Sequence, residues 1–119
     1  MKKKILVVDD SATARALFKM CMSGNLDYQL FETNDPQEAL KIALAEKPFL
    51  IILDYNMPVM EGPKIAKMMI DNGVQSKFVL MSANTQYSVI EEINNEGFVG
   101  ILEKPISAET VQSLLEKLQ

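Results

Sequence analysis

The sequence predicts an α/β protein with one parallel sheet of five strands, doubly wound, with helices on both faces. Short apolar runs rich in β-branched residues alternate five times with segments in which apolar residues recur at helical spacing. Such alternation needs crossover connections, which make the strands parallel and cover both faces of the sheet. No linker or change in composition divides the 119 residues, so we expect a single domain over residues 1–119.

The first unit is a strand at residues 4–8 followed by a helix. The strand is apolar and stops abruptly at Asp9 and Asp10. Ser11 can cap the helix, because its hydroxyl can accept a hydrogen bond from an amide of the first turn. Cys21 lies on the apolar side of this helix, where we expect it to act as a small buried hydrophobe.

The second unit is a strand at residues 28–33 with a helix behind it. Asp35 is favoured as the N-cap of that helix and Pro36 as its first residue. The helix is expected to end before Pro48.

The central strand is expected at residues 49–53, where five apolar residues follow one another. A continuous apolar run of this kind indicates a strand buried on both faces. The run ends at Asp54, and ligands of open α/β sheets bind at the carboxyl ends of the strands. Asp54 is therefore the first candidate for chemistry, although a loop aspartate that only caps backbone groups is the ordinary alternative.

The remaining elements follow the same alternation. Helices are expected around residues 65–70, 89–93 and 111–118, with Ser107 capping the last, and strands at residues 77–81 and 99–102. The fourth strand thus runs into Ser82, and the fifth ends shortly before Lys104.

Composition excludes several kinds of function. The absence of histidine removes Ser-His and Cys-His catalysis, imidazole metal sites and a phosphohistidine of the chain's own. A single cysteine excludes an internal disulfide and a multi-cysteine zinc site. The net charge of −4 argues against direct nucleic-acid binding, and the lysines at residues 2–4 are too few to reverse this. No apolar run is long enough for an export signal or for membrane insertion, so we expect a cytoplasmic protein.

If the strands are parallel, a set of polar side chains reaches one edge of the sheet: Asp9, Asp10, Asp54, Ser82 and Lys104. Crowded carboxylates repel one another, and a hard divalent cation such as Mg²⁺ relieves that repulsion through oxygen ligands. Lysine adds a positive charge and serine adds a hydrogen-bond donor. Such a pocket suits a phosphoryl group held on an aspartate, with Asp54 as the nucleophile.

These residues stand in motifs that follow one another along the chain: Asp9-Asp10, Asp54 with Met57-Pro58, Ser82-Ala83 and Lys104-Pro105. Together the motifs resemble the receiver domains of bacterial two-component response regulators, from the first strand to the last helix, in the manner of a stand-alone chemotaxis regulator. The resemblance implies a flavodoxin-like sheet with the strand order 2-1-3-4-5.

The resemblance also implies a set of metal ligands. Asp10 would bind Mg²⁺ directly, and Asp9 would bind it through a water molecule. Asp54 and the backbone carbonyl of Asn56 would complete the protein ligands.

For the phosphoryl group, the resemblance implies that Asp54 is the acceptor and that Ser82 and Lys104 contact the phosphoryl oxygens. Asn56 and Asn84 stand where family members tune the rate of hydrolysis. Neither side chain is an obvious base, so we expect slow autodephosphorylation with an intermediate lifetime. The chain would then be a phospho-acceptor with self-catalysed phosphotransfer and not an enzyme acting on other substrates.

The resemblance further implies the partners. A sensor histidine kinase or a phosphotransfer protein would supply the phosphoryl group. The sequence contains no output domain, so we expect the output to be binding of a downstream protein. We expect a monomer, with dimerisation on phosphorylation left open.

One position departs from the family pattern. Ile101 stands where members commonly have a tyrosine or phenylalanine that moves inward on phosphorylation. Phe98 and Tyr87 are interpreted as packing or surface residues. How phosphorylation is read out therefore stays open.

Three other functions are weighed against this one. A receiver-like interaction module that is never phosphorylated is favoured only by Ile101. An aspartate-based phosphohydrolase would need a second acid at the position of Asn56. A nucleotide or flavin carrier would need a glycine-rich phosphate loop after the first strand, which the sequence lacks.

Overall fold

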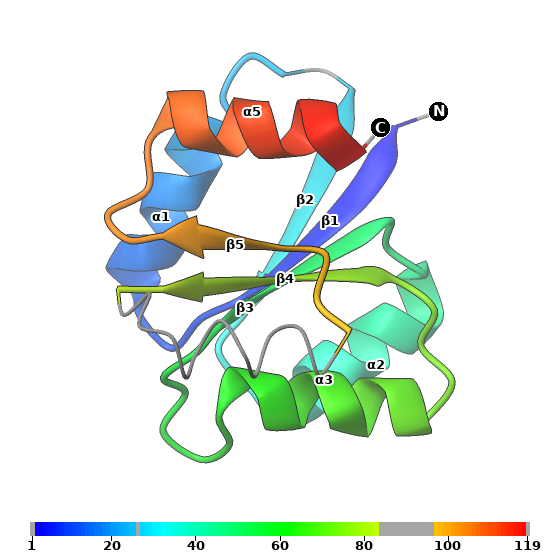
Figure 1. The fold of residues 1–119 in the computed structure, drawn as a ribbon. Coiled ribbons are helices and arrows are strands. Elements are labelled where there is room, and N and C mark those ends of the chain that lie inside the picture. Colours follow the sequence, from blue (N-terminus) through cyan, green and yellow to red (C-terminus); the bar gives the residue numbers. More distant parts are fainter. Residues whose placement is uncertain (1, 26, 84–96, 119) are drawn as a thin grey trace.

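The computed structural model describes residues 2–25, 27–83 and 97–118, and it confirms the predicted parallel sheet (Figure 1). The five strands lie in the order β2-β1-β3-β4-β5, and every neighbouring pair is parallel. The strands are β1 (Lys3–Val8), β2 (Tyr28–Thr33), β3 (Leu50–Asp54), β4 (Lys77–Ser82) and β5 (Gly100–Glu103). The described helices are α1 (Ala12–Cys21), α2 (Pro36–Glu46), α3 (Gly62–Asp71) and α5 (Ala108–Leu118). The helix expected at residues 89–93 lies outside the described residues, as do Asn84 and Tyr87.

Helices cover both faces of the sheet, because successive side chains of a strand point to opposite faces. Figure 1 shows α1 and α5 on one face and α2 and α3 on the other. Leu6 and Val8 of β1 belong to the core under α2 and α3, whereas Ile5 and Val7 belong to the core under α1 and α5. All five residues of β3 are buried, as its continuous apolar run predicts.

The predicted helix starts are confirmed by capping hydrogen bonds. The hydroxyl of Ser11 accepts from the amide of Ala14 at 3.1 Å. The carboxylate of Asp35 accepts from two amides of the first turn of α2. The hydroxyl of Ser107 accepts from the amide of Thr110 at 3.2 Å. None of the helices in the described part of the chain combines the length and the apolar character that a membrane span needs.

The helical patterns predict the positions of the described helices correctly. They predict less well which side chains of those helices are buried. Cys21 is buried, as expected. Leu17 and Ile70, however, are 38% and 46% exposed although both belong to apolar patterns.

β3 and β5 begin one residue later than expected. Phe49 and Val99, just before them, still donate backbone hydrogen bonds at 2.8 Å, so the difference is one of strand-end definition.

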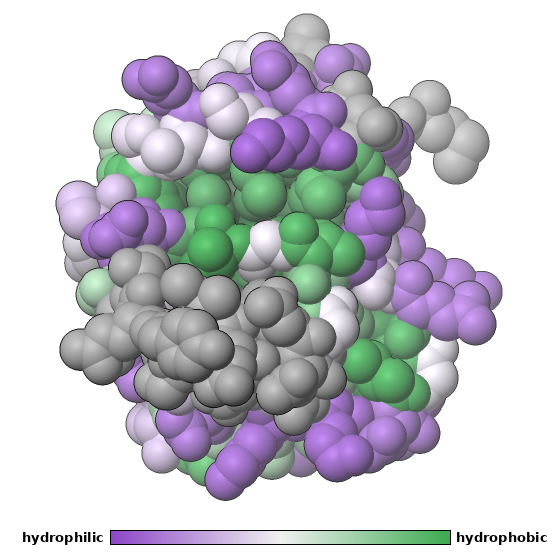
Figure 2. All heavy atoms as spheres, in the orientation of Figure 1, coloured by the Kyte–Doolittle hydropathy of each residue, from purple (hydrophilic) through white to green (hydrophobic). Residues whose placement is uncertain are grey.

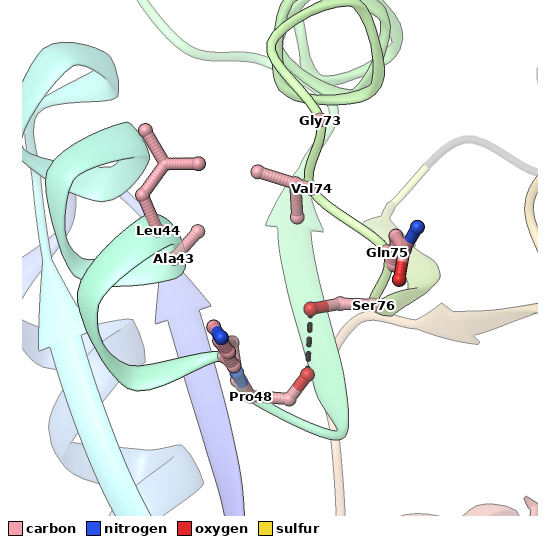
Figure 3. A pocket seen from close by; sticks show the side chains of 8 residues that line it. Ala43, Leu44, Pro48, Gly73, Val74, Gln75 and Ser76 are labelled. Carbon is pink, nitrogen blue, oxygen red and sulfur yellow. Dashed lines mark hydrogen bonds between the residues drawn. The ribbon is translucent and has the colours of Figure 1, made fainter.

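The amino edge of the sheet, where the strands begin, carries a hollow of about 460 Å³. The end of α2 and the connection from α3 to β4 line it, with Leu44 on one side and Val74 on the other (Figure 3). The hydroxyl of Ser76 donates to the carbonyl of Pro48 at 2.6 Å and joins the two segments. The predicted site residues lie at the opposite edge.

Candidate functional site

Backbone hydrogen bonds just beyond the strand ends fix the predicted site residues at the carboxyl edge of the sheet. The amides of Asp9, Tyr55 and Lys104 each donate to a carbonyl of a neighbouring strand, at 3.1, 2.9 and 2.9 Å. Because β3 lies between β1 and β4, and β5 follows β4, the loops after these strands meet above one part of the sheet. The sheet order therefore brings residues from distant parts of the sequence together.

Three carboxylates form a cluster at this edge. Asp9, Asp10 and Asp54 each offer an oxygen that lies within 4.8 Å of the others. Asp9 is fully buried, Asp54 is 5% exposed and Asp10 is open to solvent. One oxygen of Asp9 accepts from the amide of Ser11 at 2.9 Å, which fixes the orientation of that carboxylate. The cluster that the sequence predicts is thus present, with one member at the surface.

Lys104 bridges the two buried carboxylates. Its ammonium donates to Oδ1 of Asp54 at 3.1 Å and to Oδ2 of Asp9 at 3.3 Å. The lysine side chain is only partly exposed, so solvent screens these ion pairs less than it screens surface pairs. The predicted convergence of Lys104 with the acidic residues is therefore observed directly.

Burial and charge shift the acid–base properties of this pair. The pKa of Asp54 is raised, first by burial and then by the neighbouring charge of Asp9. Hydrogen bonds from Lys104 and from the backbone amide of Asn56 oppose this rise. Burial alone would lower the pKa of Lys104, but its hydrogen bond to Asp54 and the charges of Asp9 and Asp54 outweigh burial and raise it.

The donor set of the cluster fits a hard divalent cation. Three carboxylates and one ammonium leave two negative charges uncompensated within a few ångströms. All the side-chain ligands are oxygens, and the exposed position of Asp10 leaves an open side where a cation could keep bound waters. The pocket could therefore bind a metal ion.

Ser82 and Asn56 both lie close to Asp54 in the fold. Ser82 is buried at the end of β4, the strand beside the one that ends in Asp54. Asn56 is exposed, and its amide donates to the Asp54 carboxylate, which ties the loop after β3 to the cluster. These positions are compatible with the expected roles of both residues, which stay predictions.

Gly62 is a residue of this site that the sequence analysis did not identify. A Cβ atom there would lie 2.7 Å from the carbonyl oxygen of Asp54 and 3.0 Å from Cδ1 of Leu80. The amide of Gly62 donates to the carbonyl of Tyr55 at 3.0 Å. α3 thus begins directly against the end of β3, in a space where only glycine fits without displacement. No local sequence pattern indicates this close approach.

An apolar hollow of about 370 Å³ adjoins Lys104. Leu17 of α1 lines one side and Pro105 and Ile106, which follow β5, line the other. The partial exposure of Leu17 places an apolar side chain at the surface beside the charged cluster. A partner that reaches Asp54 from this direction would find a hydrophobic contact next to it.

Ile101, at the position where the sequence departs from the family pattern, is half-buried on β5. It packs against the core under α2 and α3, and it lines a shallow hollow of about 390 Å³ between β5 and α5. Figure 2 shows hydrophobic side chains gathered on the face formed by β5 and α5. Phe98 is buried, and its ring packs edge-on against Phe78 with 6.3 Å between centroids, as a packing role predicts.

Comparison with known proteins gives a consistent result. The family described as "Response regulator receiver domain" matches residues 5–116. The chain is 30% identical over 119 residues to "Sporulation initiation phosphotransferase F" of Bacillus subtilis, an alignment that covers 98% of this chain and 94% of that protein. It is 26% identical over 117 residues to "Probable chemotaxis protein CheY" of Rhizobium etli, which covers 97% of this chain and 91% of that protein.

A solved structure of the chemotaxis protein CheY4 of Vibrio cholerae superposes on the whole chain. The TM-score is 0.91 at 27% identity, and the superposition covers 100% of both chains. This chain therefore shares the order of its strands and the arrangement of its described helices with that chemotaxis protein.

Proposed function

Because this chain belongs to the response regulator receiver family, we propose that it accepts a phosphoryl group on Asp54 and signals by phosphorylation-dependent binding of a protein partner. The single observation that carries the proposal is the contact of Lys104 with both Asp54 and Asp9 at the edge of the acidic cluster. A histidine kinase or a phosphotransfer protein would be the donor. We take residues 1–119 to form one receiver domain that works in the cytoplasm.

Mg²⁺ is the proposed cofactor, held by Asp10 directly, by Asp9 through water, and by Asp54 and the carbonyl of Asn56. When bound, the ion would neutralise negative charge on the transferring phosphoryl oxygens. The oxygen donors and the two uncompensated charges of the cluster support this choice.

The chain's own residues position the acceptor for the transfer. Lys104 holds Oδ1 of Asp54, and the Asn56 amide also donates to this carboxylate, so the carboxylate has a fixed orientation. A carboxylate oxygen of Asp54 would attack phosphorus as the phosphorus–nitrogen bond of a phosphohistidine breaks. The electron pair of that bond returns to the imidazole nitrogen of the donor, and the new bond is an acyl phosphate.

After transfer, Lys104 and the Ser82 hydroxyl would contact phosphoryl oxygens. Both residues lie at strand ends next to Asp54, which supports these roles. Neither the Asn56 side chain nor that of Asn84 supplies a base for water, so hydrolysis would be slow. The chain would then act as a phosphorylated signal and not as a phosphohydrolase.

The donor protein would approach over α1. The apolar hollow beside Lys104 and the exposed part of Leu17 support an apolar contact there, close enough for a phosphohistidine to reach Asp54. The downstream partner would be a protein, bound by a monomer or by a dimer formed on phosphorylation. Ile101 implies that this output does not depend on the inward movement of an aromatic ring at that position.

Intact-mass spectrometry after incubation with Mg²⁺ and acetyl phosphate tests the proposal. The parent protein should gain one phosphoryl group, and Asp54→Asn should gain none. Omission of Mg²⁺ in the presence of EDTA should prevent the gain in the parent. A parent protein that binds Mg²⁺ but is never phosphorylated would contradict the proposal and favour an interaction module.

A further inference from the structure

α1 carries an arginine whose side chain contacts the loop after β1, which contains Asp9 and Asp10. Arg15 lies in the first turns of the helix, and its side chain is 16% exposed. Its Nη1 donates to the backbone carbonyl of Asp9 at 2.7 Å, and its Nε donates to Oε1 of Glu32 at 3.0 Å. The guanidinium thus connects β2 with the loop that follows β1.

Glu32 is itself held by a second cation. Lys19, one turn after Arg15 on the same side of α1, places its ammonium 3.0 Å from Oε2 of Glu32. The hydrogen bonds from Lys19 and Arg15 lower the pKa of Glu32, so it stays charged at neutral pH. A carboxylate fixed on both oxygens holds Nε of Arg15 in place, and the planar guanidinium then directs Nη1 toward Asp9.

The contact with Arg15 completes the fixation of Asp9. Its amide donates to the carbonyl of Thr33, and its carboxylate is held by the Ser11 amide and by Lys104. The other backbone group of Asp9 is its carbonyl, which belongs to the peptide that joins Asp9 to Asp10. Arg15 holds this carbonyl by a charge-assisted hydrogen bond, so it fixes the orientation of the peptide between the two carboxylates.

We propose that Arg15 is a positioning residue for the metal: through the Asp9 carbonyl it holds Asp9 and Asp10 in the arrangement that binds Mg²⁺, and Glu32 aims it. This inference rests on the Mg²⁺-dependent function proposed above. The Arg15 guanidinium would contact neither the metal nor the phosphoryl group, and it would orient the metal ligands by a hydrogen bond. The loss of such an orienting hydrogen bond typically weakens metal binding about tenfold or more.

Isothermal titration calorimetry of the unphosphorylated full chain with Mg²⁺ tests the proposal. Arg15→Met should weaken Mg²⁺ binding about tenfold. Glu32→Gln should weaken it about threefold, and the double variant should bind no more weakly than Arg15→Met alone, because Glu32 acts through Arg15. Lys67→Met is the control, because Lys67 is 68% exposed and pairs with Asp71 of its own helix, so the affinity of this variant for Mg²⁺ should stay within about twofold of the parent.

A second measurement separates positioning from a merely structural role. The initial rate of phosphorylation by acetyl phosphate, measured against Mg²⁺ concentration, should show a higher half-saturating concentration for Arg15→Met. The limiting rate at saturating Mg²⁺ should stay within about twofold of the parent, because the metal, once bound, restores the ligand arrangement. A general loss of folded protein would lower the limiting rate and leave the half-saturating concentration unchanged.

Equal Mg²⁺ affinity of the parent and of folded Arg15→Met would overturn the proposal. If Arg15→Met does not fold, Glu32→Gln takes its place, and parent-like affinity in that variant would overturn it equally. A parent chain that binds no Mg²⁺ would overturn both the metal assignment and the role of Arg15. A parent that binds Mg²⁺ and is phosphorylated, with variants of unchanged affinity, would overturn the role of Arg15 alone.

Discussion

At the carboxyl edge of the sheet two buried carboxylates share one lysine, whereas at the amino edge a lysine and a glutamate form a pair at the surface. Asp54 and Asp9 share Lys104 in the first region. In the second, Lys4 meets Glu46 at 2.8 Å, with both side chains more than one third exposed. Both regions join lysine to carboxylates, but in the first one lysine serves two buried carboxylates, whereas in the second one exposed lysine meets one exposed carboxylate.

The hollow at the amino edge is larger than the one beside Lys104. It measures about 460 Å³, against about 370 Å³ for the apolar hollow next to Lys104. Backbone and neutral side chains form most of its wall, with one lysine. Buried carboxylates that outnumber their lysine partner, and not the size of a depression, therefore distinguish the candidate site.

The largest effect is expected for Lys104→Met, with Lys77→Met at the amino edge as its control. Loss of a fixed positive charge at the transferring group should slow phosphorylation by acetyl phosphate about 100-fold. Mg²⁺ binding should not weaken, because the site becomes more negative. Lys77 donates to the carbonyl of Leu118 at the opposite edge, so its replacement should leave both quantities unchanged. A phosphorylation rate of Lys104→Met within threefold of the parent rate would contradict this prediction, because Lys104 would then matter no more than Lys77.

Gly62→Ala and Gly73→Ala should separate chemistry from stability. The new methyl group at residue 62 would press on the Asp54 carbonyl, so phosphorylation should slow about tenfold and unfolding in urea should become easier by about 1–3 kcal/mol. Gly73 has open space around its Cβ position but a φ of +91°, so alanine there should cost about 1–2 kcal/mol. Its phosphorylation rate should match the parent rate, and a slowed rate would show that the amino edge influences the site.

Asp54→Asn should stabilise the metal-free protein at neutral pH. The folded-state pKa of Asp54 lies above its unfolded value, so its contribution to stability is full below about pH 4 and is lost as pH rises through the folded-state pKa. Urea unfolding with EDTA should therefore show a gain on the order of 1 kcal/mol at pH 7 that shrinks in acid. Glu46→Gln, which breaks an exposed pair, should change stability by less than about 0.5 kcal/mol. An Asp54→Asn protein less stable than the parent would contradict the expectation.

Ser76→Ala is expected to change stability alone. Its hydroxyl donates to the Pro48 carbonyl, and loss of this hydrogen bond should lower the unfolding free energy by about 1 kcal/mol. Phosphorylation should be unaffected. Thermal unfolding monitored by circular dichroism checks the first quantity and the mass-spectrometric time course checks the second.

The strands and most of the candidate site could be predicted because local sequence patterns reflect the burial of side chains. β3 is covered on both faces, and this appears directly as an unbroken apolar run before Asp54. Caps such as Ser11 follow from local hydrogen bonding of short polar side chains. Asp9 and Lys104 were identified because parallel strands bring their carboxyl ends to one edge.

The rest depends on distances between elements, which no local pattern contains. The need for glycine at residue 62 arises from the approach of α3 to the Asp54 carbonyl. The reach of Arg15 to Asp9 depends on the rotation of α1 and on Glu32 of a separate strand. The exposure of Leu17 depends on which elements pack against α1, and helical spacing alone does not specify this.

The burial of β3 also has a consequence for how the proposed activity would be lost on heating. The strand is flanked by β1 and β4 and has no residue at the surface, so its amide hydrogens should exchange with solvent only through unfolding of the whole domain. Asp54, at the end of this strand, should therefore keep its position until the whole domain unfolds. On heating, capacity for phosphorylation should disappear in the same cooperative transition as the slowest-exchanging amides, with no intermediate that is folded and inactive.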